Sequence, residues 1–179
     1  MGPPRSTVVH EVEPEAVRPL RRAVLRPGRP ASEVRFPGDD DRRAAHVLVR
    51  EDDSTTTAVG SVLPEAPPWD PGRADAWRVR GMATDPDHRA RGLGSLVLDA
   101  LLAHVAASGG GLVWCSARVG ARRFYERAGF VGGDDVFESP GIGQHTNMWR
   151  MVEHRAGPAT APGGRQRSGL GSEPGPVPT

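Results

Sequence analysis

Apolar and polar positions along this chain recur with the period of a helix in some segments and of a strand in others. In residues 13–25, Val17, Leu20 and Val24 recur at helical spacing, which predicts an amphipathic helix. Residues 93–107 are almost continuously apolar, with leucine, valine and alanine at helical spacing, and predict a second, buried helix.

Short runs rich in valine, threonine and aromatic residues, bounded by glycine, proline and aspartate clusters, predict the strands. We expect them at residues 6–12, 44–50, 56–63, 77–84, 109–117, 130–138 and 144–152, with a short helix at 119–127. The proline- and glycine-rich segments 26–43 and 64–73 predict long loops, the first with one short helix at most. Because strands and helices mix throughout, we expect an α/β or mixed α+β fold with a central sheet.

The C-terminal segment differs in composition from the rest of the chain. Residues 154–179 are dominated by glycine, proline and polar residues, too poor in apolar surface to offset the entropy of ordering, so we predict a disordered tail after one domain at 1–153. No apolar run reaches the roughly 18 residues of a membrane span, and no secretory signal opens the sequence. The expectation is a cytoplasmic protein without a membrane partner.

Charge and cysteine content remove several classes of protein. The 23 basic residues nearly balance the 22 acidic ones, so no bulk charge favours nucleic acid as a partner. Every basic residue is an arginine, which excludes a Walker-type phosphate loop, a Schiff-base lysine and a pyridoxal enzyme, and hints at a GC-rich bacterial genome. The single cysteine, Cys115, excludes an intrachain disulfide and a multi-cysteine zinc site, and no metal is expected.

One junction carries most of the chemical information. The segment RARGLG, residues 89–94, stands between a predicted strand and the apolar helix. The first amides of a helix lack intrahelical partners, the helix dipole adds positive potential there, and glycine lets the backbone approach a ligand. This pattern is typical of a phosphate-binding turn, although a plain strand–helix turn that uses glycine for its geometry explains it too. The spacing R-x-x-G-x-G differs from the dinucleotide fingerprint G-x-G-x-x-G.

A second motif gives the junction a family context. The segments MATDPDHRARGLG and ARRFYERAGF, separated by the apolar helix, resemble the GCN5-related N-acetyltransferases, the GNAT superfamily. The similarity covers about residues 77–151, and the N-terminal half fits only in the order of its elements. The resemblance implies a mixed sheet splayed between strands 4 and 5 and flanked by helices. It also implies transfer of an acetyl group from acetyl-CoA to the primary amine of a small molecule or peptide.

The resemblance also assigns roles to particular positions. The pantetheine arm would lie along the backbone of Met82, Ala83 and Thr84, where Thr84 replaces the usual valine. The pyrophosphate would lie on the phosphate-binding turn, whose members are Arg89, Ala90, Arg91, Gly92, Leu93, Gly94 and Ser95. Tyr125 would protonate the departing thiolate, because a phenol with a pKa of about 10 keeps its proton at neutral pH. Arg118 stands where many relatives have an asparagine that contacts the cofactor. The resemblance therefore implies that Arg118 binds the cofactor, although the residue type differs.

No general base is obvious from the sequence. His145 is the first candidate because it falls early in the last strand, where an acceptor could approach, although a structural or solvated histidine explains it equally well. Glu138, Asp75 and a relaying water are the alternatives. Cys115, inside an apolar strand, is expected in the core, and an acetyl-cysteine intermediate is the minor alternative.

Several other questions stay open at this stage. A coenzyme A-binding module without catalysis is the rival function, and another acyl group or a hydroxyl acceptor would keep the enzyme but change its reaction. The acidic run at residues 39–41 is either a solvated turn or a recognition site for a cationic amine. Trp69 either covers the acceptor pocket or is a loop residue without a role in it. Monomer and homodimer both remain open.

Overall fold

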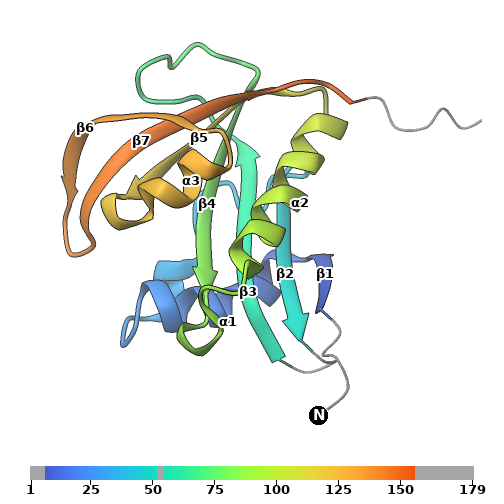
Figure 1. The fold of residues 1–179 in the computed structure, drawn as a ribbon, viewed down its shortest axis with the longest axis vertical. Coiled ribbons are helices and arrows are strands. Elements are labelled where there is room, and N and C mark those ends of the chain that lie inside the picture. Colours follow the sequence, from blue (N-terminus) through green and yellow to red (C-terminus); the bar gives the residue numbers. More distant parts are fainter. Residues whose placement is uncertain (1–6, 52–54, 156–179) are drawn as a thin grey trace, which may run out of the picture.

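The computed structural model describes residues 7–51 and 55–155 and contains one seven-stranded sheet in the order β1-β2-β3-β4-β5-β7-β6 (Figure 1). The strands are β1 (Thr7–Val12), β2 (Ala45–Glu51), β3 (Thr55–Pro64), β4 (Ala76–Thr84), β5 (Gly111–Arg118), β6 (Val131–Ser139) and β7 (Gly143–Val152). The helices are α1 (Pro14–Leu25), α2 (Leu93–Ala107) and α3 (Arg122–Arg127), with short 3₁₀ turns η1 (Ala31–Val34), η2 (Pro86–His88) and η3 (Val119–Ala121).

The predicted mixed α/β class with a central sheet is confirmed. All neighbouring strands are antiparallel except β4 and β5, which run parallel. Segment 26–43 is a long connection with only the 3₁₀ turn η1. Phe130, expected to open a strand, instead lies in the turn between α3 and β6, because its amide donates to the Tyr125 carbonyl and the residue is 2% exposed in the core.

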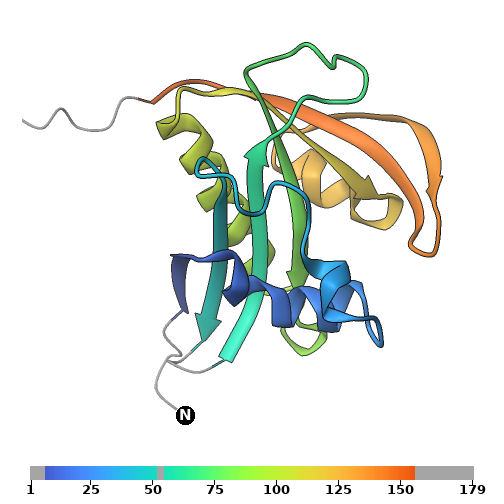
Figure 2. The same cartoon turned by 180° about the vertical axis from the view of Figure 1, so that it is seen from behind.

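Helices cover both faces of the β2–β4 part of the sheet. Figure 1 shows α2 in front of these strands, and Figure 2, from behind, shows α1 lying across the other face. The larger core gathers beneath α2 around Val97, Leu98 and Leu101. The smaller one lies beneath α1 around Val17 and Leu48. Because helices cover both faces of β2 and β3, these strands are buried along almost their whole length.

The sheet splits between β4 and β5. These strands pair only at Ala76, Trp77 and Arg78, and beyond that point β5, β7 and β6 turn away from β4 (Figure 1). A bulge bends β4 just past the last paired residue, where the register with β3 shifts and Gly81 adopts a φ of +65°. The split therefore leaves backbone groups of β4 facing a gap instead of a partner strand.

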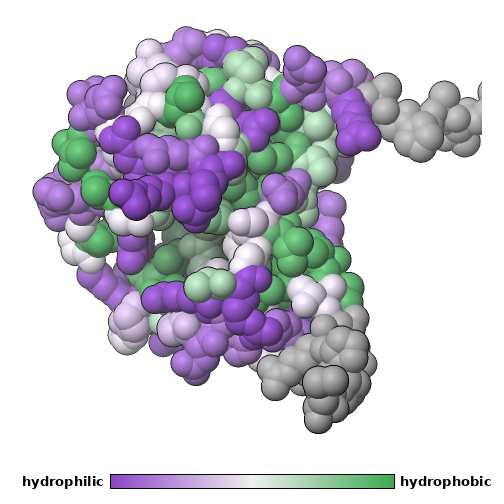
Figure 3. Space-filling model, viewed as in Figure 1, coloured by the Kyte–Doolittle hydropathy of each residue, from purple (hydrophilic) through white to green (hydrophobic). Residues whose placement is uncertain are grey.

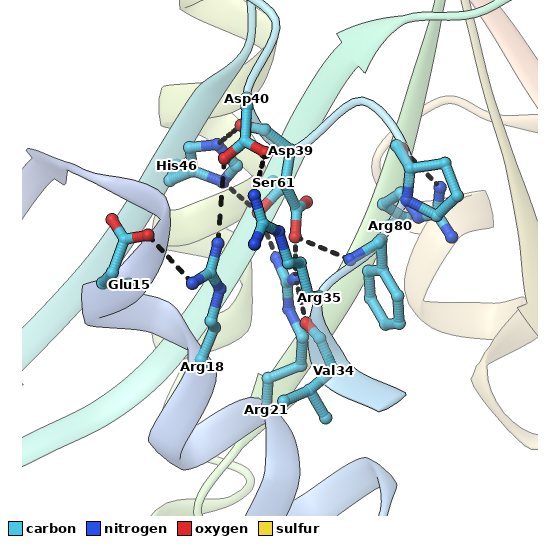
Figure 4. Close-up of polar contacts among 12 residues, drawn as sticks. Glu15, Arg18, Arg21, Val34, Arg35, Asp39, Asp40, His46, Ser61 and Arg80 are labelled. Atoms are coloured by element: carbon cyan, nitrogen blue, oxygen red, sulfur yellow. Dashed lines mark hydrogen bonds and ion pairs between the residues drawn. The ribbon is translucent and has the colours of Figure 1, made fainter. Parts of the chain in front are cut away.

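A buried polar network holds the segment after α1 against the sheet (Figure 4). Arg21 and Asp39 have fully buried side chains, and their Nη1 and Oδ2 atoms are 2.8 Å apart. Arg21 Nη2 donates to Ser61 Oγ at 2.6 Å, and His46 bridges Ser61 Oγ and the Asp39 carbonyl. A Cβ on Gly81 would lie 2.6 Å from Arg21 Nε, so the same arginine packs directly on the β4 bulge.

The described chain ends on the α2 side of the sheet, where the amide of Arg155 donates to the Ala106 carbonyl at 2.9 Å. Residues 156–179, which make up nearly all of the predicted tail, lie outside the described residues, so the proposed domain boundary stays a prediction. Within the described ranges, no helix has the length and apolar content needed to cross a membrane.

Candidate active site

A cavity of about 600 Å³ opens where β4 and β5 part. Its walls come from β4, the start of α2, α3, the end of α1 and the β6–β7 hairpin. Figure 3 shows the hollow between the two halves of this face. The cavity therefore joins segments from both halves of the chain at the split in the sheet.

At one end of the cavity lies the turn 89–95, which we call the cradle. The hydrogen bonds within the described residues include none from the backbone amides of residues 90–94. Ala90 and Gly92 both have positive φ angles, 60° and 78°. Alternation of such residues with ordinary ones turns successive amides toward one point and makes an anion-binding concavity. Together with the N-terminus of α2, these amides form a site for a phosphate group.

The two arginines expected in the cradle have different surroundings. Arg89 lines the cavity. Arg91 turns away and forms a two-point ion pair with Glu51 at the end of β2, with Nη1 2.9 Å from Oε2. Glu51 is 4% exposed, so this pair ties the cradle to the sheet. The Arg91 side chain thus anchors the loop, whereas the Arg89 side chain remains available to a ligand.

The remaining cradle residues meet the cavity in different ways. Ala90, Gly92, Leu93, Gly94 and Ser95 all line it. The Leu93 side chain is 4% exposed and packs in the core, so Leu93 offers only its backbone. A Cβ on Gly94 would lie 3.5 Å from both Phe124 Cε2 and Thr84 Oγ1. The narrow space above Gly94 is thus bounded by α3 and by the end of β4.

Met82, Ala83 and Thr84 bring β4 to the cavity beside the cradle. They lie beyond the last residue that pairs with β5, so their edge of the strand is open. The Ala83 side chain is 5% exposed and faces the α1 core, so Ala83 too offers its backbone. An extended ligand could complete this edge with main-chain hydrogen bonds, as an added strand would.

Tyr125 lies in the wall of the cavity on α3 and is 6% exposed. Its ring packs edge-on against Phe124 and Phe130, with centroids 5.0 and 5.3 Å away. Burial raises the pKa of the phenol well above 10, and the neighbouring Cys115 raises it further. The hydroxyl therefore keeps its proton throughout the physiological pH range.

His145 lies in β7, lines the cavity and is 8% exposed. Its Nδ1 is 2.8 Å from the Gly143 carbonyl. A carbonyl can only accept, so Nδ1 carries a proton and, in the neutral ring, Nε2 keeps its lone pair. The other two candidates for a base, Glu138 and Asp75, do not line the cavity, and Asp75 pairs with Arg73 at 2.8 Å.

The far end of the cavity, which we call the hairpin end, is built mostly by residues that the sequence did not single out. Its side chains are Leu25, Arg26, Phe36, Arg118, Phe137, Ile142 and His145. Arg118 ends β5, where it pairs with His145 of β7. The residues after α1 and the β6–β7 hairpin meet only in the tertiary structure, so no local pattern could have revealed them.

The other residues that the sequence singled out lie in the core or in ion pairs and aromatic clusters rather than in the cavity wall. Burial raises the pKa of the Cys115 thiol to about 12, so this side chain is a neutral core residue. Trp69 does not line the cavity and packs against Trp114 and Trp149, 5.6 and 5.4 Å away. The three aspartates of residues 39–41 pair with arginines. In the described ranges, no cluster of histidine, cysteine and carboxylate side chains is suited to hold a metal ion.

Comparison with known proteins agrees with this geometry. Residues 14–130 match the family model of the acetyltransferase (GNAT) family. The chain belongs to the GNAT family. It is also 30% identical over 144 residues to the uncharacterized N-acetyltransferase YitI of Bacillus subtilis, an alignment that covers 80% of this chain and 95% of YitI. Membership of this family makes the chain an acyltransferase.

Solved GNAT structures share the fold. A putative N-acetyltransferase from Lactobacillus plantarum superposes with a TM-score of 0.68 at 18% identity, over 82% of this chain and 99% of that one. The ribosomal-protein-S18-alanine N-acetyltransferase from Escherichia coli superposes with a TM-score of 0.64 at 15% identity, over 84% and 97%. At such identities the likeness extends to the fold alone.

Proposed function

We propose that this GNAT protein transfers the acetyl group of acetyl-CoA directly to the primary amine of a small molecule or peptide. The observation that carries the proposal is the run of backbone amides at residues 90–94 that have no partner in the described chain, opening into the split between β4 and β5. This arrangement offers amides to a diphosphate at one end and an open strand edge beyond it.

The residues present fit coenzyme A. The cradle would hold the pyrophosphate through its amides and Arg89, and the open edge of Met82, Ala83 and Thr84 would pair with the amide groups of the pantetheine arm. Arg127, which lines the same cavity, adds positive charge to its wall. Acetyl-CoA supplies the thioester whose acetyl group is transferred, so no further cofactor and no metal is required.

Two side chains supply the proton transfers. The amine nitrogen forms its bond to the acetyl carbon as the carbon–sulfur bond breaks, so the nitrogen must lose a proton and the sulfur must gain one. Tyr125 is the proton donor to sulfur, because burial keeps its hydroxyl protonated. His145 is the acceptor, because the hydrogen bond to the Gly143 carbonyl leaves the Nε2 lone pair free in the neutral ring.

The cellular setting is part of the same proposal. Cys115, the single cysteine, is compatible with a reducing compartment, and the arginine-only basic composition suits a GC-rich bacterial genome. We therefore assign the reaction to the bacterial cytoplasm.

The test separates binding from turnover. Calorimetry should show binding of coenzyme A. Incubation with acetyl-CoA and a panel of primary amines should give products whose mass, by mass spectrometry, reflects one hydrogen replaced by one acetyl group. A His145→Gln variant should bind coenzyme A as tightly as the parent and lose most of its turnover. Binding without turnover of any amine would favour a coenzyme A-binding module, and absence of binding would refute the proposal.

A further inference from the structure

The charged side chains that line the cavity are all basic. Arginines at positions 26, 78, 80, 89, 118 and 127 contribute to the wall, and no aspartate or glutamate from the described ranges does. Elsewhere in the described chain, arginines commonly pair with carboxylates, as in the ion pairs of Arg21, Arg35 and Arg91. An arginine-rich wall without carboxylates gives the cavity a positive potential, which low-dielectric walls strengthen.

Arg26 and Arg118 carry this charge at the hairpin end. Arg26 Nη1 donates to the carbonyl of its neighbour Leu25, and no carboxylate of the described residues lies within ion-pairing distance of either guanidinium. Glu33, the nearest acid to influence Arg26, is paired with Arg29 at 3.3 Å. Both side chains line the same cavity. Burial in the wall lowers the pKa of Arg26, and the positive charge of Arg118 lowers it further.

Two more arginines extend the positive surface along β4. Arg78 and Arg80 share a single carboxylate, that of Glu65, at 2.6 and 3.7 Å, so one positive charge of this group is not balanced. Arg80 also packs over the Phe36 ring, 4.3 Å from its centroid. Burial, followed by the charge of Arg78, lowers the pKa of Arg80 to about 10. These guanidinium groups are thus fixed in place, whereas Arg26 and Arg118 retain free donors.

The other side chains of the hairpin end are mainly apolar. Phe36, Phe137 and Ile142 contribute the nonpolar surface. A Cβ on Gly141, in the turn between β6 and β7, would lie 3.0 Å from Arg29 Nη2, so the hairpin touches the segment after α1. Two unpaired cations that line one cavity repel one another, and an oxyanion that bridged them would relieve this repulsion through charge-assisted hydrogen bonds.

From this geometry we infer that the acceptor amine also carries an oxyanion, a carboxylate or a phosphate, which Arg26 and Arg118 bind together. The inference rests on the proposed function and narrows it to anionic amines. The cradle has its own free amides and its own arginine, Arg89, for the cofactor pyrophosphate. The inference therefore assigns Arg118, which the family resemblance placed at the cofactor, to the acceptor. A planar guanidinium pair matches carboxylate and phosphate geometry in two-point contacts.

The first experiment compares matched acceptors. Acetyl-CoA turnover is measured with β-alanine against β-alaninamide, and with O-phosphoethanolamine against ethanolamine, so that each pair differs in its acid group. The acid of at least one pair should have a kcat/KM about ten-fold or more above its neutral partner, and the pair that shows it distinguishes carboxylate from phosphate. Arg26→Gln and Arg118→Gln should each remove this preference through KM. Arg42→Gln, an exposed arginine outside the cavity, removes the same charge and should leave the preference intact.

A second experiment needs no turnover. The protein is saturated with coenzyme A, which occupies the cradle, and is titrated with inorganic phosphate while the arginine side-chain signals are followed by NMR. The Arg26 and Arg118 signals should shift together and reach saturation, and either glutamine variant should weaken the apparent affinity about ten-fold. The Arg42 signal serves as the internal reference for nonspecific binding.

The outcomes separate the two proposals. If no amine of the panel is acetylated but phosphate saturates Arg26 and Arg118, the anion site stands and the acetyl-transfer proposal is weakened. The anion site is overturned if these signals respond no more than that of Arg42. It is also overturned if acid and neutral acceptors react equally well in the parent enzyme, or if the glutamine variants keep the preference for acids.

Discussion

Replacing Tyr125 with phenylalanine tests the proton donor with the smallest change that the chain allows. The substitution keeps the ring that packs against Phe124 and Phe130 and removes only the hydroxyl. That hydroxyl is buried beside the Cys115 thiol, a weak partner, so the folding cost should be about 1 kcal/mol or less. For a domain of this size such a loss lowers Tm by about 2–4 °C.

The kinetic effect should be much larger than the effect on stability. Loss of a general acid lowers the rate of its step by about 10²–10⁴-fold, which corresponds to about 2.7–5.4 kcal/mol in the barrier. We expect kcat to fall by this factor on a good acceptor, while calorimetry shows coenzyme A affinity within about two-fold of the parent value. Because burial raises the pKa of Tyr125 well above 10, ionisation of this tyrosine should not limit the parent enzyme on the alkaline side below about pH 10.

The control for this experiment is Cys115→Ala. It removes the side chain next to the tyrosine hydroxyl, costs some core packing, and should leave kcat nearly unchanged, since the buried thiol takes no part in direct transfer. Unchanged turnover in Tyr125→Phe, under conditions where chemistry limits the rate, would refute the role of proton donor. Weaker coenzyme A binding with unaltered chemistry would instead make the tyrosine a residue that positions the sulfur.

Three further predictions address the cradle, the buried network and the cysteine. Gly94→Glu should weaken coenzyme A binding by about 100-fold or more, because its carboxylate enters the narrow space beside the free amides. In the control Leu96→Glu, on the exposed side of the same helix turn, the coenzyme A affinity measured by calorimetry should stay within about two-fold of the parent value. Equal effects of the two substitutions would contradict the assignment of the cradle to the pyrophosphate. Arg21→Met should cost about 3–5 kcal/mol in urea unfolding, because it leaves the Asp39 carboxylate buried without its cation. The double variant with Asp39→Asn should recover part of that loss, and strictly additive losses would argue against a coupled pair. Cys115, 1% exposed with a pKa of about 12, should not react with a disulfide reagent at pH 8 until the protein is unfolded, and rapid labelling of the native state would show that its strand opens.

Much of the molecule followed from local sequence. Helical spacing of Val17, Leu20 and Val24 predicted α1, and the apolar run at 93–107 predicted α2, because each helix buries the face that its sequence makes apolar. The glycines of the cradle predicted an unusual backbone conformation, since Gly92 adopts the left-handed conformation, which is unfavourable for most other residues. The paired motifs around the cradle and Tyr125 were sufficient to indicate the GNAT family, which the family comparison confirmed.

Tertiary structure alone decided which charges remain free. Arg89 and Arg91 look alike in sequence, yet Glu51 from a distant strand holds the Arg91 side chain away from the cavity, whereas Arg89 lines it. Arg26 is one of 23 basic residues and has nothing local to mark it, and the sequence placed Arg118 only at the cofactor. They line one cavity because the end of α1 and the end of β5 meet at the split in the sheet, and no carboxylate of the described residues pairs with either of them. A sequence pattern records the geometry of one helix or strand, whereas the balance of charge in a cavity depends on which distant segments meet there.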